Sequence, residues 1–163
     1  GTVVGWSKLA DDTTDRAFVH TGGALTDIGT LGGPGSRAYA INNAGVITGD
    51  SQLSGAGDWS ASHGFIREGA AMFDIGTLGG ARSHAHSIND EGAVVGESLL
   101  PDGTTYHAFI WMDGEMTDLN DNLAPAYADW TITAARDINN SRQIAAIATN
   151  DEGNAHAVRL TPQ

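Results

Sequence analysis

The segment DIGTLGG at residues 27–33 recurs without a change at residues 74–80, and this repetition decides the fold. The two copies begin 47 residues apart. A period of that size is typical of propellers and solenoids, in which each repeat is one supersecondary unit that packs on the next. On either side of the two copies, three more short patterns recur in a fixed order.

We name the four patterns A to D. Pattern A is AYAIN (38–42), AHSIN (85–89) and ARDIN (135–139). Pattern B is GTVVGWS (1–7), GVITGDS (45–51), GAVVGES (92–98) and the degenerate RQIAAIA (142–148). Pattern C is RAFVH (16–20), HGFIR (63–67), HAFIW (107–111) and HAVRL (156–160). Pattern D contains the DIGTLGG motif and is LTDIGTLGG (25–33), MFDIGTLGG (72–80) and the divergent MTDLNDNLA (116–124). Each pattern is rich in β-branched and aromatic residues and is bounded by turn residues, which predicts a strand.

The junctions between patterns A and B, at 42–45 and 89–92, supply the Asn, Asp and Gly residues that hairpin turns require. No segment shows a long apolar period of 3.6 residues, so we expect little or no helix. Four strands in each period predict an all-β, β-propeller-like array of four-stranded antiparallel blades. A β-solenoid or a prism built from the same strands is the alternative.

The order of the patterns is B-C-D, then A-B-C-D twice, then A-B-C, which makes fourteen strands and about three and a half repeats. We predict a single repeat domain over 1–163, with a partial blade at 1–33, blades at 34–80 and 81–124, and a partial terminal blade at 125–163. Three explanations remain open: a fragment of a longer chain, a compact ring with incomplete blades, or a homo-oligomer whose copies complete the broken blade.

The chain is acidic, with 20 Asp and Glu against 8 Lys and Arg and a net charge of −12. A groove that follows a phosphate backbone needs clustered Lys and Arg, so we expect no nucleic-acid partner. No apolar run approaches the length of a membrane span, so we expect no membrane insertion.

The lengths of the connections predict which face carries function. Connections from A to B and from C to D have constant lengths, whereas those from B to C and from D to A vary. In a meandering blade the variable connections lie on one face, and binding residues tend to sit on loops held by a rigid scaffold. Trp59, Tyr106 and Trp130 lie on or beside these connections and are candidates for stacking on a sugar or anchoring a protein.

A second candidate site follows from pattern A, because the first strand of a propeller blade lines the central channel. Residues two apart share one face of a strand. Such pairs are Arg37 with Tyr39, His84 with His86, and Ala134 with Arg136. They predict a polar site for an anionic or hydroxylated ligand, and His84 with His86 has spacing suited to a metal. The alternative is that these residues line a wet channel and pair with nearby carboxylates.

Polar residues that recur in every repeat are predicted to cap turns and link strands. They are Asp27, Asp74 and Asp118, Asn42, Asn89 and Asn139, and His63, His107 and His156. We predict no cofactor. Calcium at the acidic loops 11–15 and 150–154 is an alternative, although neither loop has EF-hand spacing. No catalytic residue is predicted, because the sequence has no nucleophile elbow, P-loop or zinc-protease motif.

The HAF-like strands at 63–67 and 107–111, the DIGTLGG segments and the INNAGVITG hairpin resemble the bacterial HAF family of extracellular repeats. The resemblance covers nearly the whole chain and implies a propeller-like architecture at an extracellular or cell-surface location. It implies no defined activity. The last repeat departs from the pattern, with DLNDNLA in place of DIGTLGG, and is typical of a terminal, capping repeat.

We therefore expect a non-catalytic extracellular binding or assembly module that presents variable loops to a glycan or a protein partner. The first alternative is a carbohydrate-active enzyme with its site in the central channel or on the loop face. The second is a structural subunit of a surface filament or matrix. Fold alone does not decide among them, because propellers host many functions.

Overall fold

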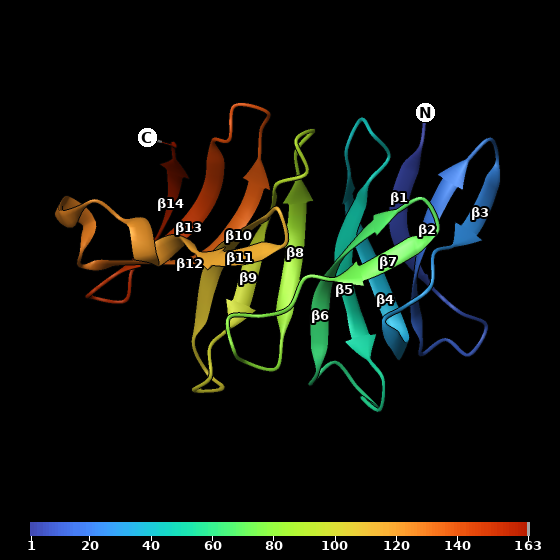
Figure 1. Ribbon diagram of the computed structural model, residues 1–163. Helices are drawn as coiled ribbons and strands as arrows, with labels where there is room; N and C mark the ends of the chain where they lie inside the picture. Colours follow the sequence, from blue (N-terminus) through green and yellow to red (C-terminus); the bar gives the residue numbers. More distant parts are fainter. Residues whose placement is uncertain (163) are drawn as a thin grey trace.

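The computed structural model describes residues 1–162, in which fourteen strands form four antiparallel sheets that stand side by side in chain order (Figure 1). The first sheet is β1 (Val3–Lys8), β2 (Asp15–Thr21) and β3 (Ala24–Asp27). The second is β4 (Gly32–Ile41), β5 (Ile47–Leu53), β6 (Ser62–Glu68) and β7 (Ala71–Asp74). The third is β8 (Ser83–Ile88), β9 (Val94–Leu99), β10 (Tyr106–Met112) and β11 (Glu115–Asp118). The fourth is β12 (Trp130–Ile138), β13 (Ile144–Asn150) and β14 (Ala155–Leu160).

The prediction of an all-β fold is confirmed. The described residues contain no α-helix, and two short 3₁₀ helices, η1 (Leu119–Asn122) and η2 (Pro125–Tyr127), lie in the connection between the third and fourth sheets. No helix within residues 1–162 has the length and apolar character needed to cross a bilayer. Gln163, the last residue of the predicted terminal blade, lies outside the described part.

We call the interface between two successive sheets a seam, and each of the three seams has its own apolar cluster. Successive residues of a strand point to opposite faces, so the middle sheets contribute to the seams on both sides. In β9, for example, Val94 packs in the middle seam and Val95 in the last seam, and both are fully buried. Phe65 and Phe109 are the largest fully buried side chains, one in the first seam and one in the middle seam.

The DIGTLGG motif crosses from the outer strand of one sheet to the first strand of the next. In the second copy, the Asp74 carboxylate accepts a hydrogen bond from the Gly76 amide at 2.7 Å, and Ile75 is buried in the middle seam. Gly80 passes so close to the third sheet that an added Cβ would collide with the Leu99 carbonyl oxygen. The motif recurs because each residue meets a local requirement of the crossing.

The recurring polar residues have the structural roles that the sequence predicts. Asn42 Oδ1 accepts hydrogen bonds from the amides of Ala44 and Val46, which caps the hairpin between β4 and β5. The side chain of the same residue donates to the carbonyl of Asn89, 47 residues later, at 3.0 Å. Neighbouring hairpins are therefore linked to each other, which holds successive sheets in the same orientation.

In each of the first three sheets, a basic side chain on the pattern C strand (β2, β6 or β10) binds the recurring aspartate on the adjacent outer strand. The three pairs are Arg16 with Asp27 at 3.0 Å, His63 with Asp74 at 2.8 Å, and His107 with Asp118 at 2.5 Å. His156 occupies the same place in β14, at the edge of the fourth sheet. It lies next to Trp130, at a ring-centroid distance of 5.1 Å.

Candidate functional site

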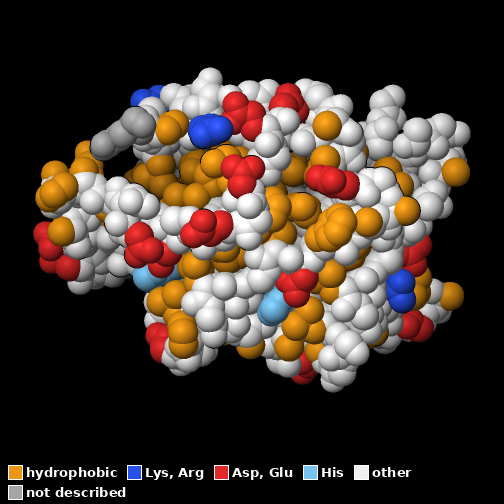
Figure 2. All heavy atoms as spheres, viewed as in Figure 1, with side chains coloured by type: hydrophobic (Ala, Val, Ile, Leu, Met, Phe, Trp, Pro, Cys, Tyr) orange, Lys and Arg blue, Asp and Glu red, His pale blue; other side chains and the backbone are white. Residues whose placement is uncertain are grey.

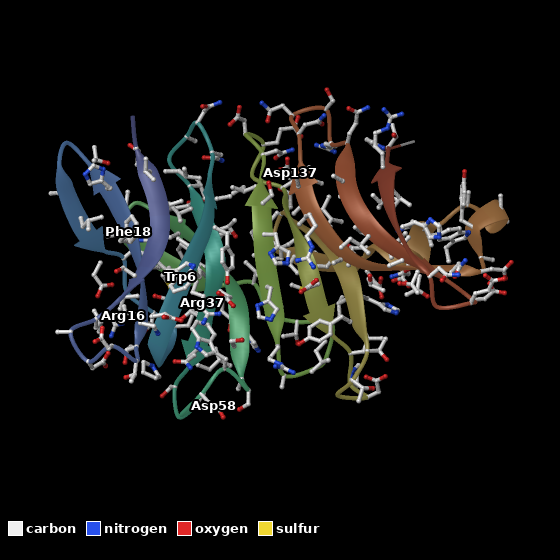
Figure 3. The ribbon with its side chains drawn as sticks, turned by 180° about the vertical axis from the view of Figure 1, so that it is seen from behind. Trp6, Arg16, Phe18, Arg37, Asp58 and Asp137 are labelled. Carbon is white, nitrogen blue, oxygen red and sulfur yellow. The ribbon has the colours of Figure 1, made fainter. Side chains whose placement is uncertain are left out.

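The candidate site is a surface along β4, β8 and β12, the first strands of the second, third and fourth sheets, which we call the inner-strand surface. Its first part is centred on Arg37, whose guanidinium lies 4.1 Å from the ring of Trp59 and 5.1 Å from that of Trp6. Figure 3 shows Trp6 and Arg37 next to each other where the first two sheets meet. A guanidinium stacks well on aromatic faces, so the three side chains hold one another in place.

Arg37 also forms an ion pair across the first seam. Its Nε donates to Asp15 at 2.9 Å and its Nη2 donates at 2.5 Å. Asp15 is almost completely buried. Burial by itself would raise the pKa of this carboxyl, but the hydrogen bonds from Arg37 and Lys8 outweigh it and lower the pKa. The Asp15 carboxylate is therefore charged at neutral pH and fixes the position of Arg37.

The second part of the surface is centred on Asp50 in β5. This carboxylate is fully buried, and His84 Nδ1 lies 2.7 Å from Oδ2 across the middle seam. The other oxygen, Oδ1, has no hydrogen-bond partner within residues 1–162. Tyr39 is nearby, and its burial together with the Asp50 charge raises the pKa of its hydroxyl. Asp50 thus combines a fully buried carboxyl group with one oxygen that has no hydrogen-bond partner in the described part of the chain.

The third part joins β8 to β12. Arg136 Nη1 lies 2.8 Å from His86 Nε2, and its Nη2 lies 3.3 Å from Glu97. Burial would raise the pKa of Glu97, but His86 and Arg136 lower it. The rings of His84 and His86 are nearly parallel, 6.4 Å apart.

Seven of the eight candidate residues predicted from the sequence lie on this surface. Tyr39 is 6.0 Å from His86 and Tyr106 is 6.4 Å from His84, measured between ring centroids. Trp130, the first residue of β12, is the exception, because it packs in the last seam beside His156. The connection that precedes this residue lies beside the last seam, and a role of Trp130 in ligand binding stays a prediction.

Sequence reasoning missed the acidic residues of the surface. Asp50 and Glu97 occupy the same place in pattern B, between its second glycine and its serine, and Trp6 replaces them in the first repeat. The strand register places Asp50 directly opposite Arg37 and Glu97 directly opposite His84. The recurrence of an acidic residue opposite a basic residue was the available signal.

The acidic loops predicted as candidates for calcium use their aspartates to cap their own turns. Asp11 accepts hydrogen bonds from the amides of Thr13 and Thr14 at 2.9 Å, and Asp102 likewise caps its own loop. Thr105 and Thr104 lower the pKa of Asp102 to about 2. Within residues 1–162 no group of three or more His, Asp or Glu side chains is arranged to hold a metal ion. Metal binding by His84 with His86, and calcium binding by the acidic loops, stay predictions.

Comparisons of the chain with protein-family models, with curated proteins and with solved structures gave no match. The resemblance to HAF repeats therefore stays a prediction. The inner-strand surface alternates aromatic faces with carboxylate, imidazole and guanidinium groups. This combination suits a ligand that has both an apolar face and hydroxyl groups.

Proposed function

We propose that the protein is a non-catalytic binding module that recognises a glycan on its inner-strand surface. The observation that carries the proposal is the convergence of aromatic and charged side chains from all four sheets and from connections far apart in the sequence. Trp6 comes from the first sheet, Trp59 from the connection between β5 and β6, Tyr106 from the third sheet and Arg136 from the fourth.

Accessibility supports the proposal. Trp6 is 45% exposed and Tyr39 is 38% exposed, so both rings present area on which the C–H face of a sugar ring stacks. Arg37 and Arg136 supply donors for hydroxyl groups, while their ion pairs hold them in position. A site held in place before binding costs less conformational entropy when the ligand binds.

The proposal includes a propeller-like arrangement of the four sheets and an extracellular setting. The repeat of 47 residues and the antiparallel order within each sheet support the propeller-like arrangement. The resemblance to HAF repeats supports the extracellular setting. Self-association that completes the first or last sheet is a further prediction from the sequence.

The test is a glycan array, followed by titration of the best-bound glycan. We expect Trp6→Ala and Tyr39→Ala each to weaken binding by about tenfold or more, because each removes a stacking surface worth about 1–2 kcal/mol. Trp130→Phe is the matched control, since it alters an aromatic residue outside the inner-strand surface, and it should bind as the parent does. An array without a bound glycan, or unchanged binding by both alanine variants, would refute the proposal.

A further inference from the structure

Arg82, the residue before β8, is a basic side chain of the inner-strand surface without an acidic partner. It lies two residues before His84 and so shares that residue's face of the strand. Within residues 1–162 its guanidinium forms no ion pair, and its buried Nε has no hydrogen-bond partner. The other two arginines of this surface, Arg37 and Arg136, are each paired with a carboxylate.

The guanidinium of Arg82 lies beside an aromatic ring and near a variable connection. Its central carbon is 5.9 Å from the centroid of the Tyr106 ring, and that ring is 6.4 Å from the ring of His84. On the connection between β5 and β6, Asp58 caps the Ser60 amide at 2.9 Å. Hydrogen bonds from Ser60 lower the pKa of Asp58, and the positive charge of Arg82 adds to the effect. Figure 3 shows Asp58 below Arg37, at the lower end of the sheets.

The backbone of Arg82 is fixed by both neighbouring strands. On one side Arg82 forms an isolated parallel bridge with Ser62 of β6, whose amide donates to the Ala81 carbonyl at 3.3 Å. On the other side the Leu99 amide of β9 donates to the Arg82 carbonyl at 2.8 Å. The base of the side chain is therefore positioned before a ligand binds, which lowers the entropic cost of binding.

Arg82 does not recur in the other repeats. Its place in the second sheet is taken by Gly35, where an added Cβ would lie 3.1 Å from Trp59. Its place in the fourth sheet is taken by Ile132, which is buried in the last seam. The recurring polar residues cap turns and link strands in every repeat, whereas Arg82 occurs once and forms no ion pair within residues 1–162. This difference favours a role in binding over a role in folding.

The electrostatics of the whole chain do not attract anions. The net charge is −12, and on the face of the molecule that Figure 2 shows, acidic side chains are spread widely and basic ones are few. The buried carboxylate nearest in the sequence of contacts, that of Asp50, is engaged by His84 at 2.7 Å. An anionic group would therefore bind through close contact with a local cation and not through the long-range field.

We propose that the inner-strand surface binds a glycan that contains a hexuronate, and that Arg82 pairs with the carboxylate of this sugar beside the ring of Tyr106. The terminal nitrogens of a guanidinium match the two oxygens of a carboxylate in parallel hydrogen bonds. The aromatic ring offers an apolar face to the C–H groups of the sugar. This inference rests on the proposed glycan function, to which it adds the class of glycan and the residue that selects it.

The first test needs no variant. Each hexuronate-containing oligosaccharide of the glycan array is compared with its carboxyl-reduced form, in which the carboxylate has become a primary alcohol. We expect the parent protein to bind the acidic form about tenfold or more tightly, because hydrogen bonds to charged groups are stronger than those between neutral groups. Calorimetric titration of the best-bound pair measures the ratio of the two dissociation constants.

The second test is Arg82→Gln, which removes the charge and keeps a polar side chain. It should weaken binding of the acidic form by about tenfold or more and leave the carboxyl-reduced form nearly unchanged. A purely structural role would weaken both forms alike. The matched control is Arg67→Gln, because Arg67 is also half-buried with an unpartnered Nε but lies near the other end of β6, outside the inner-strand surface. It should keep the preference of the parent, and circular dichroism of both variants should match that of the parent.

The outcomes separate this inference from the proposed function. Binding of neutral glycans only, or equal binding of the acidic and carboxyl-reduced forms, would overturn the inference and leave the proposed function standing. A preference for the acidic form that persists in Arg82→Gln would overturn the role of Arg82. An array without a bound glycan would overturn both the proposed function and the inference.

Discussion

The middle seam and the last seam are built from the same repeat, but they fill space differently. In the middle seam Phe109 is fully buried against Ile75, Val94 and their neighbours. In the last seam Val158 stands at the same place of pattern C and is only partly buried, and an apolar cleft of about 860 Å³ opens beside it. The smaller side chain and the absence of an outer strand on β14 within residues 1–162 leave this volume open.

Side-chain hydrogen bonds link the sheets across both seams, although through different residues. In the middle seam the Ser83 hydroxyl accepts from the Gly64 amide at 2.8 Å and donates to the Gly76 carbonyl at 2.6 Å. In the last seam the Asn120 side chain makes the corresponding link. It accepts a hydrogen bond from the Ile132 amide at 2.7 Å and donates one to the Ile132 carbonyl at 3.0 Å. A divergent repeat thus keeps its buried hydrogen bonds, whose loss is costly, while it gives up apolar packing.

The largest difference between the seams should appear when each is truncated at the same place. Phe109→Ala should lower the free energy of unfolding by about 3–5 kcal/mol, because it opens a cavity in a closed core. Val158→Ala should lower it by only about 1 kcal/mol, since it removes less apolar area beside an existing cleft. Urea denaturation followed by circular dichroism measures both, with Phe65→Ala as a second closed-core variant. Equal losses at positions 109 and 158 would contradict the comparison.

A smaller difference is expected for the polar residues. Ser83→Ala leaves two groups in a fully buried setting without partners and should lower the free energy of unfolding by about 1–3 kcal/mol. Asn120→Ala should lower it by about 1 kcal/mol, because water reaches this half-buried site more easily. Ser141→Ala, on an exposed hairpin, is the control and should have little effect. A loss at position 120 larger than that at position 83 would show that the last seam depends on its hydrogen bonds more than the middle seam does.

The smallest effect concerns the hairpin between β12 and β13. Gly45 and Gly92 have φ of 82° and 85°, and in the last repeat Arg142 occupies the same place with φ of 56°. Arg142→Gly should raise the free energy of unfolding by up to about 1 kcal/mol, because a left-handed conformation is costly for any residue with a Cβ. The exposed ion pair with Glu91 contributes little, about 0–1 kcal/mol.

Arg142→Ala removes the same ion pair but keeps the unfavourable conformation, so it serves as the reference variant. The glycine variant should unfold at a higher urea concentration than the alanine variant. The reverse order would mean that the degenerate hairpin is not strained relative to the hairpins of the middle sheets.

Much of the inner-strand surface was predictable because pattern A repeats and because residues two apart share one face. This reasoning found Arg37 and Tyr39, and also His84 and His86. It did not find that Arg37 pairs with Asp15 or that His84 pairs with Asp50, since these bonds cross seams. It also did not show that Trp130 lies apart from the other candidates, because connection lengths do not reveal which seam a long connection lies against.

The sequence by itself determined the strands, their order within each sheet and the turns between them. These features depend on short-range physics, namely side-chain alternation, hairpin glycines and aspartate caps, and they repeat with the sequence. Only the tertiary structure decided which side chains meet across a seam and where packing fails. His84 reaches Asp50 from 34 residues away and Arg136 reaches His86 from 50 residues away. Such contacts depend on how whole sheets stack, so neither the inner-strand surface nor the cleft beside β14 is visible in any single repeat.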